Sequence, residues 1–382
     1  MATSFSKLYE IDHRLYRLLR KVELLLYINP INAEKERLKF YKNKYNTDPI
    51  FRYPKCQLNL RSIRKELFRL KMQKIENEAI ALLYEEVRWY FSGILDCIEQ
   101  VGKNELFLRS SLKTFGAPSA IDIYRAQTIA QTLKHKLGTE EKTPLYATEE
   151  ALEYMKGFIE PYGFDVTVKS AMHISSKAMV SNSKKSVILK RGERFSSLEL
   201  EALAHHEIGV HLVTTFNAEN QGLKIFSLGF PFNVQSQEGL AVLAEYYTGA
   251  LGANRLFELA IRVLLADNVI KGISFAASFD QLVSDYRLSR DHAFRLVTRL
   301  YRGGGFTKDR LYLPGFLELF YDHSDANKMD WLLAGKTAQE YLHIRPVLEE
   351  FELLNPNKYH SRTFSKVKPA HTELDQLLHR LR

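Results

Sequence analysis

The chain has 382 residues, of which 45% are hydrophobic and 26% are charged, and this composition excludes a disordered or fibrous protein. Its net charge is +9, and residues 1–75 hold 18 Lys and Arg against 7 Asp and Glu. Two cysteines, Cys56 and Cys97, are too few for a disulfide framework. No run of 18 apolar residues predicts a membrane span, and no apolar signal-peptide core follows the N-terminus. We therefore expect a cytoplasmic protein without a membrane partner.

The basic N-terminal segment has more than one interpretation. It could attract an acidic polypeptide or nucleic acid, or it could form a solvated helical surface with no partner. The chain contains no zinc-finger spacing, RRM aromatic motif or phosphate-binding glycine loop, so nucleic-acid binding is the weaker interpretation.

Helical patterns fill the first 140 residues. Leucines at three- and four-residue spacings predict a helix over 8–28, which Pro30 ends. A charged segment predicts a second short helix over 33–46, and two prolines predict extended chain over 47–56. The same periodicity predicts further helices over 59–100, with one break, and over 105–115 and 119–136.

The pattern changes after the loop GTEEKTP at 138–144, where we expect a boundary. A helix is predicted near 148–160, and β-branched residues predict strands at 164–171, 177–182 and 185–192. These strands are expected to form a small antiparallel sheet. Ser196 and Glu199 then form a capping box, which starts the next helix near residue 197.

This next helix carries the residues with the clearest chemistry. His206, Glu207 and His211 stand in the order His-Glu-x-x-x-His, and Glu238 follows 27 positions after His211, within QEGLA. Two histidines, an adjacent acid and a later glutamate are the residue set of a catalytic zinc site, in which Glu207 would be the general base. Manganese or iron could occupy the same ligands.

The spacing of the histidines predicts an unusual helix. Zinc proteases commonly place two histidines four residues apart, and this chain has one residue more. Residues five apart in an α-helix differ by about 140° around the axis, so the two imidazoles would diverge. A π-helical turn brings them to one face, and Gly209 offers backbone freedom there. We predict a widened turn over 206–211; the alternative is two ordinary helix histidines.

HEIGVH and QEGLA resemble the motifs of the microtubule-associated tyrosine carboxypeptidase family and its bacterial relatives. The resemblance continues in ELFLRSSLKTFGAPS at 105–119, RGGGFTKDRLYLPG at 302–315 and AGKTAQE at 334–340. Its eukaryotic members imply a zinc-dependent carboxypeptidase that removes a C-terminal tyrosine from tubulin, a polypeptide with an acidic tail. Position by position, it implies that His206, His211 and Glu238 bind one Zn²⁺ and that Glu207 is the catalytic acid and base.

Other residues are candidates for supporting roles. Glu245 lies seven residues after Glu238 on the same helical face, where it would orient a ligand imidazole or form a helix salt bridge. His205 points about 100° away from His206 and is predicted to be structural. A carboxypeptidase needs a cation for the terminal carboxylate of its substrate and a donor for the oxyanion. The candidates for substrate binding are Arg302, Lys308, Arg310 and Tyr312, unless they are ordinary surface residues.

These patterns predict an α+β, predominantly α-helical metallocarboxypeptidase. A sheet directly before the metal-binding helix is familiar from zincin-type metalloproteases, so we expect a zincin-like core. The predicted regions are a helical N-terminal region (1–140), the zincin-like catalytic region (141–355) and a basic tail (356–382) with a weak final helix. A non-catalytic binding protein that retains a metal site, and a basic nucleic-acid-binding module, are the alternatives.

Overall fold

The computed structural model describes residues 5–137, 145–172, 174, 176–181, 184–322, 325–364 and 372–382. The expected boundary at 138–144 lies outside these residues, as does Asn182 at the end of one predicted strand. Helices dominate and the strands are few and short, so the chain is an α+β protein that is predominantly α-helical, as predicted. No helix in the described ranges has the length and apolar character needed to cross a membrane.

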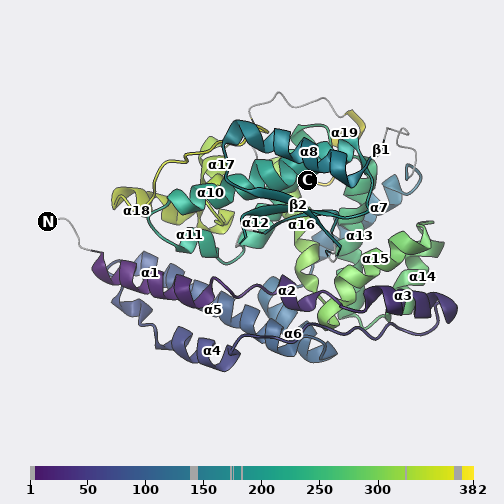
Figure 1. The fold of residues 1–382 in the computed structure, drawn as a ribbon, viewed down its shortest axis with the longest axis horizontal. Helices are drawn as coiled ribbons and strands as arrows, with labels where there is room; N and C mark the ends of the chain where they lie inside the picture. Colours follow the sequence, from purple (N-terminus) through teal and green to yellow (C-terminus); the bar gives the residue numbers. More distant parts are fainter. Residues whose placement is uncertain are drawn as a thin grey trace.

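The N-terminal helices lie together on one side of the molecule, where α1, α4, α5 and α6 are neighbours (Figure 1). The single helix predicted over 8–28 is wrong, because the chain leaves the helix after Leu19 and starts again at Leu25. The interruption lets the side chains of Val22 and Leu24 reach the core. Leu26, which the single helix would have placed on the buried face, is 56% exposed. The break predicted within 59–100 is confirmed between α4 and α5. The bounds are α1 (Ser6–Leu19), α2 (Leu25–Ile28), α3 (Ala33–Lys42), α4 (Leu60–Arg69), η1 (Met72–Lys74), α5 (Glu78–Gln100), α6 (Asn104–Phe115) and α7 (Ala120–Leu133).

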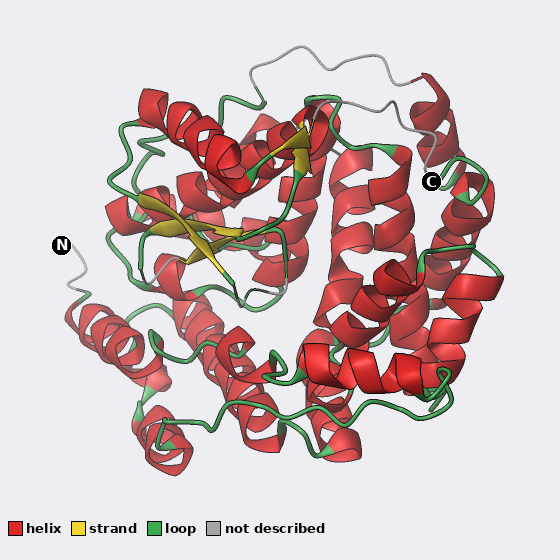
Figure 2. Ribbon diagram, turned by 45° about the vertical axis from the view of Figure 1, so that its right-hand side comes forward, coloured by secondary structure: helices red, strands yellow, loops and turns green. Residues whose placement is uncertain are grey.

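The three predicted strands form one sheet in the order β2-β4-β3, with bounds β2 (Thr167–Ala171), β3 (Ala178–Ser181) and β4 (Ser186–Lys190). Figure 2 shows the strands together among the helices. β3 pairs with β4 antiparallel, but β2 pairs with β4 parallel, so the prediction of a wholly antiparallel sheet is wrong. Side-chain alternation indicates which face of a strand is buried and carries no information on its direction. A separate antiparallel pair joins β1 (Leu145–Tyr146) to β5 (Phe195–Ser196).

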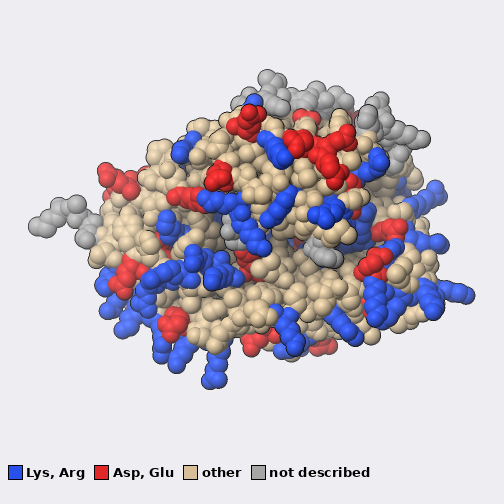
Figure 3. Space-filling model, in the orientation of Figure 1, with Lys and Arg blue, Asp and Glu red and all other residues tan. Residues whose placement is uncertain are grey.

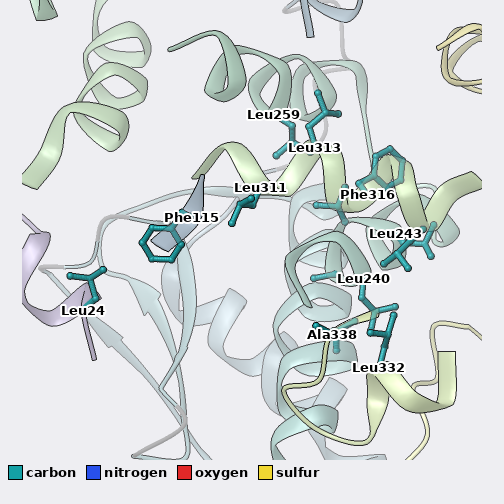
Figure 4. Packing of buried hydrophobic residues seen from close by; sticks show 14 of the residues in the cluster. Leu24, Phe115, Leu240, Leu243, Leu259, Leu311, Leu313, Phe316, Leu332 and Ala338 are labelled. Atoms are coloured by element: carbon teal, nitrogen blue, oxygen red, sulfur yellow. The ribbon is translucent and has the colours of Figure 1, made fainter. Parts of the chain in front are cut away.

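Among the remaining helices, α12 (Asn233–Tyr247) packs along α16 (Tyr312–Tyr321) and against η3 (Ala204–Leu212). Figure 4 shows Leu240 and Leu243 of α12 beside Phe316 of α16 and Leu332 of α17. The bounds of the other helices are α8 (Thr148–Ile159), η2 (Glu160–Tyr162), α9 (Ser197–Leu203), η3 (Ala204–Leu212), α10 (Val213–Asn220), α11 (Ile225–Leu228), α13 (Ala253–Ile270), α14 (Phe275–Ser284), α15 (Arg290–Tyr301), η4 (Arg302–Gly304), η5 (Thr307–Leu311), α17 (Ala326–Leu333), η6 (Gln339–Ile344), α18 (Arg345–Glu350) and α19 (Thr372–Arg380).

Two glycines allow α12 and α16 to touch through their backbones. A Cβ atom placed on Gly239 would lie 2.3 Å from the carbonyl carbon of Gly315, and one on Gly315 would lie 2.1 Å from the Gln235 carbonyl oxygen. Real Cβ atoms essentially never come so close, so neither position has room for a side chain. Glu238 precedes Gly239, so this backbone contact also fixes the position of Glu238 relative to α16.

The predicted tail packs onto the rest of the protein where it is described. Thr363 is fully buried, and its hydroxyl lies 2.6 Å from Nδ1 of His205. The predicted final helix is confirmed as α19, in which Leu377 and Leu378 are buried. α7 likewise packs on α13, so N-terminal, central and C-terminal segments share one hydrophobic core.

Candidate metal centre and active site

The predicted widened turn is confirmed. α9 begins at the expected capping box of Ser196 and Glu199, and the chain continues as a π-helix over Ala204–Leu212. The i→i+5 hydrogen bonding of this helix widens its turn and brings His206 and His211 to one face, with their ring centroids 4.9 Å apart. Hydroxyls of two following threonines donate hydrogen bonds to the His211 carbonyl oxygen, at 3.0 Å and 2.7 Å. They satisfy an acceptor near the point where the helix returns to α geometry.

Gly209, between the two histidines, has a packing reason to be glycine. A Cβ atom there would lie 2.8 Å from Oγ1 of Thr363, so the π-helix and the C-terminal segment approach too closely for a side chain. Thr363 also contacts His205, which stacks edge-on against Phe158. His205 is thus held away from His206 by packing partners, in agreement with its predicted structural role.

Three side chains converge as a candidate metal-binding cluster: His206, His211 and Glu238. Nε2 of each histidine lies 3.7 Å from Oε2 of Glu238, and all three candidate ligand atoms lie within 4.8 Å of one another. Tetrahedral zinc with bonds of about 2.05 Å separates its ligand atoms by about 3.4 Å, so small side-chain adjustments would suffice. Two imidazoles and one carboxylate also match the donor set of catalytic zinc.

Glu245 holds the first histidine in one orientation. Its Oε1 accepts a hydrogen bond from Nδ1 of His206 at 2.7 Å, which leaves Nε2 directed to the cluster. Arg255 donates to both oxygens of the same carboxylate, at 2.9 Å and 3.0 Å. Burial opposes ionisation of Glu245, but Arg255 and His206 outweigh it and lower its pKa to about 2. The carboxylate is therefore a permanent acceptor for His206.

Lys308 neutralises the candidate ligand carboxylate. Its Nζ lies 2.9 Å from Oε1 of Glu238, on the oxygen that does not face the histidines. Burial favours neutral forms of both groups, yet the pair holds the pKa of Glu238 well below and that of Lys308 above its usual range. Glu238 thus presents a single free oxygen to a metal. Lys308 therefore lies next to the cluster, where a substrate-binding residue would have to be.

Tyr312 lies next to Lys308, whose Nζ is 5.6 Å from the centre of the phenol ring. Burial and the nearby Glu238 charge raise the pKa of Tyr312 to about 12, so the hydroxyl stays protonated at neutral pH. No described residue hydrogen bonds this hydroxyl, which leaves a donor available to another molecule.

Glu207 is buried beside His206, at 8% exposure. None of the residues that the structure describes hydrogen bonds its carboxylate or pairs with it as an ion. A buried carboxylate without a partner next to a metal site can accept a proton from water, which is the role that its position in the motif predicts.

Two predicted substrate-binding arginines make structural contacts. Arg302 is 3% exposed and donates a hydrogen bond to Asn29 at 2.6 Å, and Arg310 donates to the carbonyl oxygens of Phe115 and Gly116 at 2.7 Å and 3.2 Å. Both side chains therefore fasten the segment after α15 to the N-terminal helices. The structure gives them this role, and brings Lys308 and Tyr312 to the candidate metal centre.

Sequence reasoning missed a row of charged residues on α13, of which Arg262 is buried and Arg255 and Glu258 are partly buried. The three lie at three- and four-residue spacings in a mostly apolar helix, and therefore share one face. Glu258 is hydrogen-bonded to Nε2 of His292 on α15 at 2.6 Å. Charges spaced as a helical stripe within an apolar segment were the signal that could have identified this face.

The sequence was also compared with known proteins and structures. A model of the family described as microtubule-associated tyrosine carboxypeptidase matches residues 38–381. No curated protein matches the sequence significantly. Among solved structures, one described as a lipoprotein from Colwellia psychrerythraea matches with 15% identity and a TM-score of 0.48, over 84% of this chain and 73% of that chain.

Proposed function

The chain belongs to the microtubule-associated tyrosine carboxypeptidase family, and from this premise we propose that it is a zinc-dependent carboxypeptidase. The observation that carries the proposal is the π-helix. It places His206 and His211 within reach of Glu238, and beside them Glu207 has no hydrogen-bond or ion-pair partner among the described residues. The sheet directly before this helix supports a zincin-like classification of the core.

The proposed mechanism assigns a role to each residue of the site. A zinc ion held by the two histidines and Glu238 would lower the pKa of a bound water to about 7 and polarise the scissile carbonyl. Glu207 accepts the proton of the attacking water and then delivers it to the leaving amine. Glu245 keeps His206 in the tautomer that presents Nε2. The Tyr312 hydroxyl donates a hydrogen bond to the oxygen on which negative charge develops.

The substrate is proposed to be a polypeptide with an aromatic C-terminal residue and an acidic tail. Figure 3 shows Lys and Arg side chains gathered over the N-terminal helices on the lower left of that face. Exposed basic residues on α1 and α4 include Lys7, Arg14, Arg17, Arg61, Lys65 and Arg69. Such a surface raises the local concentration of an acidic chain, and its effect falls with increasing salt.

A peptide library tests the proposal. Metal-loaded wild-type protein and the Glu207→Gln variant are incubated with peptides of varied C-terminal residues, and the products are read by mass spectrometry. We expect loss of one C-terminal residue with the wild type, and a rate about 10³-fold lower with the variant. Metal analysis of both proteins is the control, because Glu207→Gln leaves all three candidate ligands in place. Equal products from the two proteins, or internal cleavage alone, would contradict a carboxypeptidase that uses Glu207.

A further inference from the structure

Arg262 of α13 is a buried arginine whose guanidinium lacks hydrogen bonds. The residue is 4% exposed, and no described residue accepts a hydrogen bond from any of its nitrogens. The nearest carboxylate oxygen, on Glu258, lies 3.6 Å from Nη2, and Nε is buried without a partner. Burying a cation without full hydrogen bonding is unfavourable, so this arginine requires a reason beyond folding.

Neighbouring arginines are satisfied in the way that Arg262 is not. Arg255 binds Glu245 through two hydrogen bonds, and Arg299 donates to Asp309 at 2.8 Å. Glu258, the nearest acid to Arg262, is already engaged by His292 at 2.6 Å. The carboxylates near Arg262 therefore accept their hydrogen bonds from other side chains, and Arg262 meets Glu258 only as a 3.6 Å ion pair without a hydrogen bond. Its planar fork can still bind an anion from outside the chain.

Arg262 lies close to the candidate active site. Its guanidinium carbon is 5.2 Å from the ring centre of Tyr312, whose ring is also 5.6 Å from Nζ of Lys308. Lys308 in turn contacts the candidate ligand Glu238 at 2.9 Å. Arg262 and Lys308 thus lie next to the same aromatic ring, and Lys308 contacts the candidate metal-binding cluster. The separation between Arg262 and the cluster is comparable to the length of one substrate residue.

We propose that Arg262 receives the α-carboxylate of the substrate's C-terminal residue. This inference rests on the proposed carboxypeptidase function, and it names the residue that would restrict the enzyme to cleavage at the C-terminus. A guanidinium binds a carboxylate through two parallel hydrogen bonds, and exclusion of water strengthens that pair. The Tyr312 ring lies next to both Arg262 and Lys308, so it would pack against the terminal side chain when the carboxylate binds.

The test measures binding rather than turnover. Calorimetry of the metal-loaded Glu207→Gln protein would compare one peptide ending in tyrosine with the same peptide carrying a C-terminal amide. We expect the free acid to bind about 100-fold more tightly, because the amide lacks the charge that strengthens hydrogen bonds to Arg262. Adding Arg262→Met should abolish this preference, and Arg262→Lys, which keeps the charge without the fork, should reduce it about tenfold.

A stability measurement separates this role from a structural one. Arg262→Met removes a buried cation that none of the described residues hydrogen bonds and whose ion pair with Glu258 is 3.6 Å long, so the melting temperature of the metal-free protein should change little. Arg302→Met is the matched control, since Arg302 is equally buried but donates hydrogen bonds to Asn29 and Asp309; its melting temperature should fall.

The possible outcomes distinguish the two proposals. If the acid and the amide bind equally, or if Arg262→Met keeps the preference, the assignment of Arg262 is overturned while the peptide library still decides the peptidase. If the library shows no Glu207-dependent cleavage, the carboxypeptidase proposal fails whatever the binding result. A melting temperature that drops as far in Arg262→Met as in Arg302→Met would also overturn the inference. Preserved stability with lost preference supports it.

Discussion

Two buried groups of charges lie side by side in this protein and are organised in opposite ways. In the candidate metal-binding cluster, His206, His211 and Glu238 turn their free atoms toward one common point. In the arginine cluster on the other side of Lys308, Asp309 is bound by Arg299 and Arg302 at 2.8 Å and 3.5 Å. The first group has the arrangement that the proposed metal ion requires, whereas in the second one carboxylate is shared by two guanidinium groups.

This difference indicates how the proposed carboxypeptidase site would be built within a helical core. The metal-binding cluster depends on groups held apart, because its ligands must converge without bonding one another. The arginine cluster depends on groups held together, and its tight pairs leave Arg262 open. Lys308 belongs to both, since it pairs with Glu238 and its charge also helps to lower the pKa of the adjacent Asp309. Substitutions in the arginine cluster should therefore lower the stability of the fold, and substitutions in the candidate metal-binding cluster should lower metal affinity.

The largest effect should come from Asp309→Asn. Asp309 is 2% exposed and is held ionised by Arg299 and Arg302, which keep its pKa below the usual range despite burial. Removing its charge leaves the buried guanidinium of Arg302 and the partly buried one of Arg299 uncompensated, and we expect the free energy of unfolding to fall by about 3–5 kcal/mol. Urea denaturation of the metal-free protein measures this loss.

Asp325→Asn is a useful control for that measurement. Asp325 caps α17, and its carboxylate oxygen accepts hydrogen bonds from two backbone amides at 2.9 Å and 3.2 Å. Asparagine can retain such a cap, so the change should be small, about 0.5 kcal/mol or less. A loss at Asp309 no larger than at Asp325 would mean that the arginine cluster is not essential to folding.

Gly239→Ala should damage the metal-binding cluster by moving a whole helix. Its new Cβ would lie 2.3 Å from the backbone of Gly315, so α12 must shift and take Glu238 with it. We expect a loss of about 3 kcal/mol in stability together with weaker metal binding. Gly157→Ala on α8 is the matched control, since nothing lies within 4 Å of its Cβ, and it should stabilise by about 0.5–1 kcal/mol. Unchanged metal affinity in Gly239→Ala would show that Glu238 tolerates displacement.

Glu245→Gln tests whether the partner of His206 tunes metal binding. The amide keeps the shape of the side chain but loses the charge that Arg255 and His206 share. Metal affinity should fall about 10- to 100-fold, as is typical when a partner of a ligand histidine is removed. Competition with a chromophoric chelator gives the affinity directly. An affinity equal to that of the wild type would assign Glu245 to a salt bridge with Arg255 alone.

The sequence predicted the parts of the site that follow helical geometry. The five-residue spacing of His206 and His211 required a π-turn, and the seven-residue spacing of Glu238 and Glu245 placed both on one face of α12. It could not predict Arg262, because its role depends on which acids nearby residues engage. It also overlooked Thr363, which packs against Gly209 from more than 150 residues away. Contacts so distant in sequence leave no local periodicity.

For the fold, periodicity identified most helices but failed where tertiary packing overrode it. Leucines continue at helical spacing through 8–28, yet the chain breaks after Leu19 because Val22 and Leu24 reach the core only from a turn. The sheet failed for a different reason. The direction of β2 relative to β4 is set by the path between them, and no strand's own residues encode that path.

The smallest effect, a dependence on pH, distinguishes the two clusters without any substitution. Burial would lower the pKa of His206, but Glu238 and Glu245 raise it to about 9 in the metal-free protein. The protonated ring then contributes stability that is complete below its ordinary value of 6.5 and is lost as pH rises through about 9. Metal must displace this proton, so affinity should rise about tenfold per pH unit up to about 9 and then level off.

Calorimetry in buffers of different ionisation enthalpy would count the protons released on metal binding. Asp309 responds with the opposite sign, because its pKa is lowered and its contribution to stability is lost only in acid. Metal-free protein should therefore lose stability at both ends of the pH range, and metal should restore it at the alkaline end alone. If metal affinity does not change between pH 7 and 9, His206 is not a ligand that must lose a proton. The proposed difference between the two clusters would then be wrong for His206.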